Sequence, residues 1–216
     1  MVKWFKKLQD VFFRPSVFFK RVEKEKEYPK VLFFYVIVAI IVGIFSMIVS
    51  IPVYIKMGSA IFALFAVLMG VIGTVIGAFI MPFIVSAFNH LGVLVVGGRE
   101  GFFNTFKPST YAALIPLIYS PVYAVIGLLL ELIFPVVQPI GATTMPWGNF
   151  VIRMIIGGVI GLIIIVHSLI VEVIGLSHYQ KISKGRALLA ALFVPLVILV
   201  LVLVAAAIIA LISFAF

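Results

Sequence analysis

The most prominent pattern in the sequence is a series of five long apolar runs separated by short polar segments. The runs lie approximately at residues 31–55, 61–88, 111–134, 151–175 and 188–213. Each is longer than the roughly 20 residues that a helix needs to cross the hydrocarbon core of a bilayer. The pattern predicts an all-α, polytopic membrane protein with five transmembrane helices.

The segment before the first apolar run has an amphipathic pattern instead. At 100° per residue, apolar residues fall on one side of a helix and polar residues on the other. The apolar stripe comprises Trp4, Phe5, Leu8, Val11 and Phe12. Pro15 should end this helix and start a second one, which turns Phe18, Phe19 and Val22 toward lipid or protein.

Two parts of the chain therefore differ in character: a basic amphipathic N-terminal segment at 1–30 and a five-helix transmembrane domain at 31–216. The first helix is expected to lie in the membrane interface, and anchoring of the topology is the simpler alternative role. The residues expected at the lipid interface are Trp4, Phe5, Lys6, Lys7, Leu8 and Phe12. Further on, glutamates and lysines alternate from Glu23 to Glu27, which is typical of a solvated helix face.

The basic residues between the apolar runs are distributed unevenly. All but Lys56 and Arg153 of the 16 basic residues precede the first run or lie in the second-to-third and fourth-to-fifth loops. Positive charge favours the cytoplasmic side, so the N terminus is predicted to be cytoplasmic and the C terminus outside. Anionic headgroups at the cytoplasmic face are the expected partners of these cations.

The composition excludes several classes of protein. With 65% hydrophobic and 11% charged residues, the chain cannot be a soluble globule, in which about 25% of residues are charged. The net charge of +9 lies at the membrane surface, so nucleic-acid binding is not expected. There is no cysteine for a disulfide or a thiol ligand. The basic start of the chain has no small-residue cleavage site, so the first span should direct insertion.

The motifs of membrane and soluble enzymes are missing. The chain has one aspartate, no His-Glu-x-x-His pair, no Gly-x-Ser-x-Gly elbow and no phosphate-binding Gly-Lys-Ser/Thr loop. Only Glu131 and Glu172 lie within the apolar runs, at opposite ends of the bundle by the predicted topology. We therefore expect no enzyme activity, no catalytic residue, no metal site and no cofactor.

Ionisable residues inside a span are candidate functional groups, because a charge at the centre of the bilayer costs about 3 kcal/mol. Glu131 and Arg153 should meet at the outer end as a structural ion pair, with an external binding site as the alternative. A charge cluster is predicted at the inner end from His90, Arg99, Glu172 and Arg186. For His167, a neutral imidazole bonded to a neighbouring helix is favoured over a proton relay.

Small residues and prolines mark other features of the runs. Two ridges of small residues predict packing seams between helices. They are Ala66, Gly70, Gly73 and Gly77 in the second run, and Gly157 and Gly161 beside Gly158 in the fourth. Kinks are expected from Pro82, Pro116, Pro121 and Pro195. An uncharged, turn-rich stretch at 135–149 predicts an external loop, with Trp147 as an interfacial anchor.

Three stretches of the chain carry motifs with a recognisable order. The first is Gly97-Gly98-Arg99-Glu100-Gly101-Phe102-Phe103-Asn104-Thr105-Phe106-Lys107, leading into Tyr111 and Pro116. The second is Gly175-Leu176-Ser177, followed by Lys184-Gly185-Arg186-Ala187 and Pro195, and the third is Arg14-Pro15-Ser16-Val17-Phe18-Phe19. In order and spacing they resemble the Yip (Ypt-interacting protein) domain family of five-span membrane proteins, over nearly the whole chain. The matching motif residues are Gly98, Gly101, Phe106, Tyr111, Pro116, Gly175, Ser177 and Ala187.

The resemblance implies a helical, five-span, non-enzymatic membrane protein with a cytoplasmic N-terminal region. Eukaryotic relatives associate with prenylated Rab GTPases and with one another, whereas the prokaryotic branch has no settled biochemical role. This chain lacks the eukaryotic Asp-Leu-Tyr-Gly-Pro element and has only Glu27-Tyr28-Pro29 in its place. The chain is similar to the short prokaryotic type of the family, and its composition is similar to that of archaeal proteins. Its expected location is therefore a prokaryotic cell membrane. The departures weigh against small-GTPase binding.

Three functions are consistent with these observations. The favoured one is a membrane adaptor or organiser that acts through lipid and protein contacts at the cytoplasmic face, with itself or other membrane proteins as partners. The alternative is a small transporter, channel or lipid-moving protein that uses the charged residues in its spans, and a continuous polar path across the bundle would distinguish it. A lipid enzyme is the third, with Glu172 and His90 or His167 as its acid/base pair.

Overall fold

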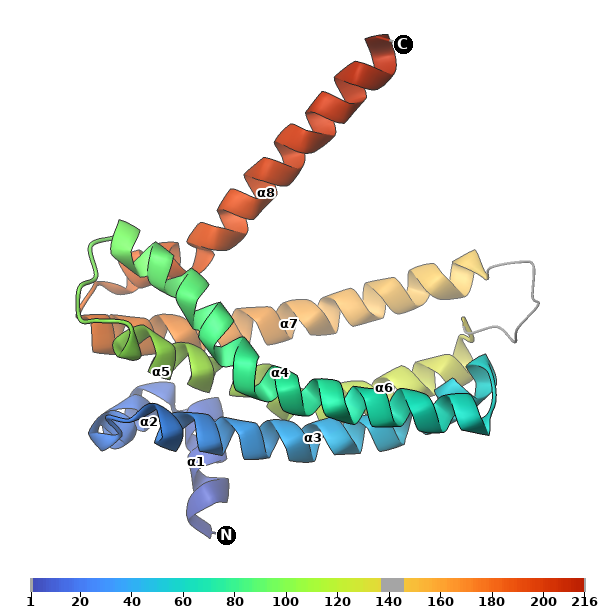
Figure 1. The fold of residues 1–216 in the computed structure, drawn as a ribbon, viewed down its shortest axis with the longest axis horizontal. Helices are drawn as coiled ribbons and strands as arrows, with labels where there is room; N and C mark the ends of the chain where they lie inside the picture. The colour runs from blue at the N-terminus through green and yellow to red at the C-terminus, as the bar shows by residue number, and fades with distance from the viewer. Residues whose placement is uncertain (1, 137–145, 216) are drawn as a thin grey trace.

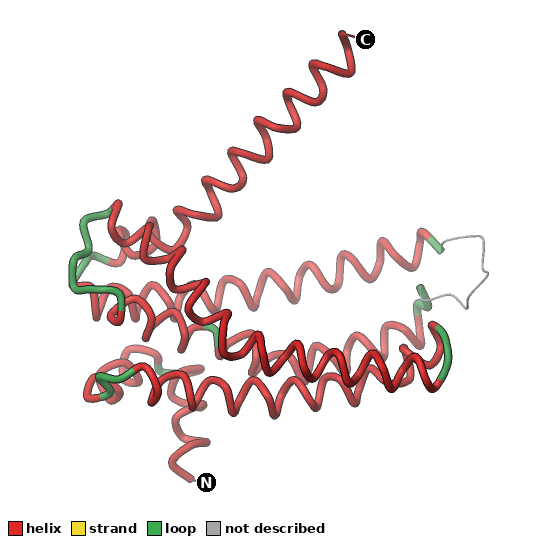
Figure 2. The backbone as a smooth tube through the Cα atoms, in the orientation of Figure 1, coloured by secondary structure: helices red, strands yellow, loops and turns green. Residues whose placement is uncertain are grey.

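A computed structural model of the chain describes residues 2–136 and 146–215, with side chains for 4–136 and 146–209. The described residues are mainly helical and contain no strand (Figure 2). In chain order the elements are α1 (Val2–Phe13), α2 (Pro15–Arg21), the 3₁₀ helix η1 (Val22–Lys24), α3 (Tyr28–Met57), α4 (Ala60–Val95), α5 (Phe103–Ala112), α6 (Leu114–Ile133), α7 (Trp147–Gln180) and α8 (Lys184–Ala215).

Five segments in the described part are long and apolar enough to cross a membrane: α3, α4, α5 with α6, α7, and α8. This confirms the predicted all-α, five-span fold. α3, α6 and α7 run along the long axis of the molecule, together with most of α4 (Figure 1). We call the end that carries the N-terminal segment and the α4–α5 and α7–α8 loops the basic end, and the opposite end the far end.

The third span begins earlier than the apolar run at 111–134 predicts. α5 starts at Phe103, and α6 continues the span after Ala112. The sequence of α5 is polar, but all its residues from Thr105 to Ala112 are buried, packed against α3, α4 and α7. Protein contacts rather than lipid bury this helix, which is why hydropathy alone missed it. The prediction that Lys107 lies in a cytoplasmic loop is wrong, since its side chain is 1% exposed.

Two interior prolines accompany changes in the outline of the bundle. α4 contains Pro82 and changes direction part-way along its length (Figure 1). α8 packs its first half on α4 and α7, and a Cβ atom on Gly92 would collide with the backbone of Ala190. From Pro195 to Ile209 every residue of α8 is exposed, and the helix runs away from the other spans (Figure 1). The close approach at Gly92 and a buried cluster that includes Val93, Ala187 and Ala191 join α4 to α8.

The glycine ridges predicted as packing seams differ from one another. Gly70 does pack closely, because a Cβ atom there would lie 2.5 Å from Met47 Sδ on α3. A Cβ atom on Gly73, Gly158 or Gly161 would meet no described atom within 4 Å, the helix's own backbone aside. Gly158 and Gly161 therefore form no seam with another helix of this chain.

The largest hydrophobic core lies at the basic end, and the N-terminal segment supplies part of it. Fully buried Val11, Phe18 and Phe19 pack in one cluster with Tyr111 on α5 and Val171 on α7. α1 runs across the direction of α3 rather than along it (Figure 1). The N-terminal segment is thus a structural component of the bundle.

Candidate functional site

A network of three polar side chains joins the N-terminal segment to the third span. Lys7 on α1 donates to Glu25 Oε1 at 2.9 Å and to Tyr111 Oη at 2.8 Å. Tyr111 in turn donates to the second carboxylate oxygen of Glu25. We call this the Lys7–Glu25–Tyr111 network. It corrects the prediction that the alternating charges at Glu23–Glu27 are only a solvated face.

Two opposing effects act on the pKa of Lys7 in this network. Burial lowers the pKa of Lys7, whereas its hydrogen bond and ion pair with Glu25 act to raise it. The ammonium group also lies 4.4 Å from the ring centroid of Phe34 and 4.8 Å from that of Tyr111. Aromatic faces attract a cation in such positions, so they offset part of the lost hydration. Lys7 is held by protein, not by lipid headgroups as predicted.

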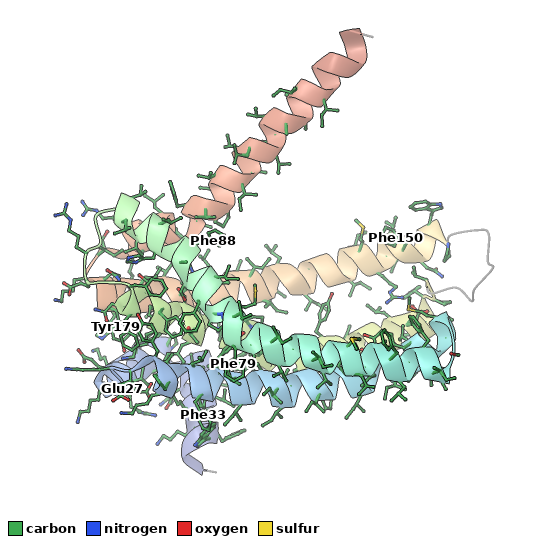
Figure 3. All side chains as sticks on the ribbon, viewed as in Figure 1. Glu27, Phe33, Phe79, Phe88, Phe150 and Tyr179 are labelled. Atoms are coloured by element: carbon green, nitrogen blue, oxygen red, sulfur yellow. The ribbon has the colours of Figure 1, made fainter. Side chains whose placement is uncertain are left out.

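A second set of contacts fixes α2 and η1 against α5 and α7. Tyr179 donates to the carbonyl oxygen of Phe19 at 2.8 Å, and Lys107 donates to the carbonyl oxygen of Glu23 at 3.3 Å. Lys107 Nζ also lies 4.6 Å from the ring centroid of Tyr179. These bonds satisfy the polar ends of buried side chains in an apolar core. Figure 3 shows Tyr179 among the side chains crowded at the basic end.

The end of α1 reaches the middle of the bundle. His167 Nε2 lies 3.0 Å from the carbonyl oxygen of Phe12, and His167 Nδ1 lies 3.2 Å from Tyr119 Oη. The Phe12 ring packs edge-on against the imidazole, with centroids 4.6 Å apart. The imidazole therefore bridges two other parts of the chain, which is the arrangement expected for a structural histidine.

Some residues of the predicted lipid-interface stripe pack against protein, and others are exposed on the molecular surface. Leu8 and Phe12 pack against the buried core, and Trp4 packs on Phe34 with ring centroids 5.1 Å apart. Phe5 is 73% exposed, and Lys6 is exposed as well. Two of the six predicted residues thus face outward without a described partner, while the helix is held chiefly by its protein-facing side.

The residues of the predicted inner-end charge cluster do not assemble as a group. Asn89 and Ser109 both donate to Glu172 Oε1, Ser109 at 2.7 Å. In the described part of the chain, neither Arg99 nor Arg186 forms an ion pair with Glu172, and both arginines are exposed. The prediction relied on opposite charges at the same end of the bundle. Neutral donors from α4 and α5 reach Glu172 instead.

His90 belongs to a different group, centred on Gln180 at the end of α7. His90 Nδ1 lies 2.9 Å from Thr105 Oγ1, which also accepts from Gln180 Nε2 at 3.0 Å. Gln180 bonds the carbonyl oxygen of Gly101 and the backbone N–H of Glu100 as well. Gly101 adopts a φ of +87°, which a side chain would strain. Gln180 therefore fixes the shape of the α4–α5 loop.

Three charged residues meet at the far end. Arg153 donates to Glu131 Oε2, so the predicted pair of Glu131 and Arg153 is present in the structure. Lys56, at the end of α3, donates to Glu131 Oε1 at 2.8 Å. The sequence does not identify Lys56 as a third member, because its place on the same side as Arg153 indicates only the topology. We call these residues the far-end triad.

The chemistry available at these sites is limited to hydrogen bonds and charge. Within residues 2–136 and 146–209, no three of the His, Asp and Glu side chains come together as a metal site would require. The buried polar groups described above serve to connect helices to each other. The arrangement favours a structural and binding role.

A family model for the Yip1 domain matches residues 10–207 of the chain. The chain belongs to the Yip1 domain family. The match includes α2, the Glu25 side of the network, the first four spans and the fifth as far as residue 207. No curated protein and no solved structure matches the chain. Yip1 proteins are in general a family of non-enzymatic membrane proteins.

Three of the Yip motif residues of this chain contact the docked N-terminal segment. Tyr111 is the centre of the network, and Phe106 packs on Tyr28 with ring centroids 4.9 Å apart. A Cβ atom on Gly175 would lie 2.5 Å from Pro108 Cβ and 2.6 Å from Phe19 Cζ. Gly175 is therefore the position at which α7 makes room for α2.

The other motif residues lie in loops of the basic end, in a contact between helices and in the first turn of α6. A Cβ atom on Gly98 would lie 2.5 Å from Val93 Cγ1, and Ser177 closes the α7–α8 turn by donating to the carbonyl oxygen of Ile182 at 2.7 Å. Ala187 is fully buried where α8 meets α4 and α7. Pro116 lies in the first turn of α6, where a missing N–H is tolerated. The Yip motifs thus have mostly structural roles here.

Proposed function

We propose that this Yip1-family protein is a non-enzymatic organiser of the membrane, with its basic end in the cytoplasm and its C terminus outside, in a prokaryotic cell membrane. The observation that carries this proposal is the docking of the N-terminal segment into the bundle. A docked segment holds its outward-facing basic side chains in fixed positions. The result is a permanent cationic surface rather than a loose basic tail.

The surface combines residues from three parts of the chain. Its exposed basic residues are Lys6, Arg14, Lys20, Arg21, Lys24, Lys26, Lys30, Arg99, Lys181, Lys184 and Arg186. Each basic side chain near an anionic membrane surface contributes about 1 kcal/mol of attraction. We infer that this surface gathers anionic lipid headgroups and acidic partner segments, including those of other membrane proteins. Small GTPases are not proposed as partners.

Lipid selectivity tests this function directly. The purified protein is reconstituted in mixed phosphatidylcholine and phosphatidylglycerol membranes, and spin-labelled lipids report how strongly each lipid associates with it. We expect selectivity for phosphatidylglycerol, reduced severalfold in K20Q/K24Q/K26Q. The matched control E23Q/E27Q alters the same segment but should retain or raise the selectivity. Equal selectivity of wild type and the triple variant would contradict the proposal.

A second candidate function, movement of protons, ions or lipid across the membrane, is favoured by one feature. Glu172 is bonded only to neutral donors, and Ser86 Oγ and Thr110 Oγ1 are buried without a hydrogen-bond partner in the described part of the chain. Ser86 lies three residues from Asn89, and Thr110 follows Ser109. Flux in sealed vesicles that is lost in Glu172→Gln would support this function, and no flux in either protein would reject it.

A further inference from the structure

The far half of the bundle contains a groove between α6 and α7 of about 500 Å³. Its lining includes Tyr123, Leu130, Phe150 and Met154, and it is mainly apolar. A second groove of about 410 Å³ lies between α3 and α6 and also contacts Arg153. Both volumes fall within the roughly 300–1,000 Å³ that is typical of small-molecule sites.

Glycines create the depth of the first groove. Apart from the backbone of its own helix, a Cβ atom on Gly127 or Gly158 would meet no described atom within 4 Å. A Cβ atom on Gly157 would lie 3.3 Å from Tyr123 Oη. Larger residues at these positions would fill the space. Since both helices span the membrane, the groove can admit an acyl chain.

The far-end triad lies beside this groove and contains more positive than negative charge. Lys56 and Arg153 share the single carboxylate of Glu131. Glu131 is 5% exposed, whereas the side chains of Lys56 and Arg153 are 37% and 26% exposed. One positive charge is therefore unbalanced, and both cations can reach a further anion.

No other acidic side chain of the chain can balance that charge. The protein has seven acidic residues, of which six lie in the N-terminal segment, in the α4–α5 loop or in the basic-end half of α7. Glu172 follows Arg153 by 19 positions along α7, which corresponds to about 28 Å of helix. A partly buried charge without a partner carries a desolvation cost. An external anion would remove that cost.

We propose that the groove and the far-end triad bind one phospholipid with an anionic headgroup. Its phosphate contacts Lys56 and the remaining donors of Arg153, and an acyl chain occupies the groove between α6 and α7. Arg recognises phosphate well, because its planar guanidinium can form paired hydrogen bonds. This site lies at the end opposite to the cationic surface of the proposed function, so neither proposal depends on the other.

Native mass spectrometry of the purified protein tests the site by counting retained lipids. The experiment starts from K20Q/K24Q/K26Q, which removes three exposed cations from the basic end, and uses phosphatidylglycerol and phosphatidylcholine as probes. We expect one strongly retained phosphatidylglycerol. Arg153→Gln and Lys56→Gln should each lose the preference for phosphatidylglycerol. Gly127→Leu should lose retention of both lipids, whereas Gly161→Leu, an open glycine outside the groove lining, should lose neither.

These variants separate lipid binding from folding. Removing either cation leaves Glu131 paired with the other, so the bundle should stay folded by circular dichroism. If Gly127→Leu does not fold, Met154→Trp fills the same groove from the exposed face of α7. Unchanged lipid retention in Arg153→Gln and in the groove-filling variant would overturn the proposal. So would loss of the headgroup preference in excess inorganic phosphate, which would assign the cations to a free anion.

Discussion

Tyr111, in the third span, donates a hydrogen bond to the carboxylate of Glu25, 86 residues earlier in the chain. Lys7 completes the contact by bonding both partners. The bond connects the segment before the first span to the part of α5 that the Yip motif identifies. The N-terminal segment is therefore docked in the bundle, and we propose that it displays a fixed cationic surface.

Removing the Tyr111 hydroxyl should weaken this docking. In Tyr111→Phe the half-buried Lys7 and Glu25 each lose a hydrogen-bond partner, which should cost about 1–3 kcal/mol. Thermal unfolding in detergent measures the loss. Tyr54→Phe is the matched control, because no hydrogen bond of Tyr54 is found among the described residues. Equal midpoints for the two variants would show that the network contributes nothing to stability.

A large residue at Gly175 should displace α2 from α7. The contacts with Pro108 and Phe19 leave no room for a side chain, and overpacking of a core typically costs about 1–3 kcal/mol. We expect Gly175→Leu to free the backbone of this segment, so that trypsin cleaves rapidly after Lys20, Arg21 and Lys24. Gly161→Leu, on the same helix but facing open space, should be cleaved at the wild-type rate. Slow cleavage of both variants would refute the steric argument.

The far-end triad predicts an order of stabilities. Glu131→Gln leaves two neighbouring, partly exposed cations without their carboxylate, and losing charged hydrogen bonds of this kind should cost about 1.5–3 kcal/mol. Arg153→Gln should cost less, because the pair of Lys56 and Glu131 remains. The midpoints of thermal unfolding compare them. A larger loss in Arg153→Gln would mean that the triad does not depend on Glu131.

Lys7 should give stability a measurable pH dependence. Its pKa in the folded protein lies below its ordinary value of 10.5, so the unfolded chain binds more protons in the window between the two values. The stability that Lys7 contributes is therefore full above pH 10.5 and is lost as the pH falls through the folded-state pKa. Relative to Lys7→Met, the wild-type unfolding midpoint should rise with pH in this window. A constant difference between the two proteins would contradict the lowered pKa.

Local sequence patterns predicted the spans well, because hydropathy depends on each residue and not on its distant partners. The break at Pro15 and the inward-facing pair Phe18 and Phe19 could also be predicted, since proline and helical spacing act locally. Glu131 and Arg153 could be paired because the antiparallel order of two spans places them at one end. These features need only the chain order and the bilayer as solvent.

Contacts between segments distant in sequence could not be predicted from local patterns. Glu25 lies in an alternating run of charges that is typical of a solvated face, and nothing local identifies Lys7 and Tyr111 as its partners. The polar sequence of α5 suggests a loop, because its burial comes from other helices rather than from lipid. The predicted grouping of Glu172 with Arg99 and Arg186 failed for the same reason: charge and depth do not determine which helix faces which. The family motif residues Tyr111 and Gly175 were the local signals for the docking site.

Hydrogen exchange of the backbone amides tests the docking of the N-terminal segment most directly. In neutral-lipid nanodiscs, amides from Leu8 to Val22 should be protected in the wild type and should lose protection in Tyr111→Phe and Gly175→Leu, while the spans stay protected. If the wild-type segment exchanges as fast as in Gly175→Leu, it is not docked, and the fixed cationic surface does not exist.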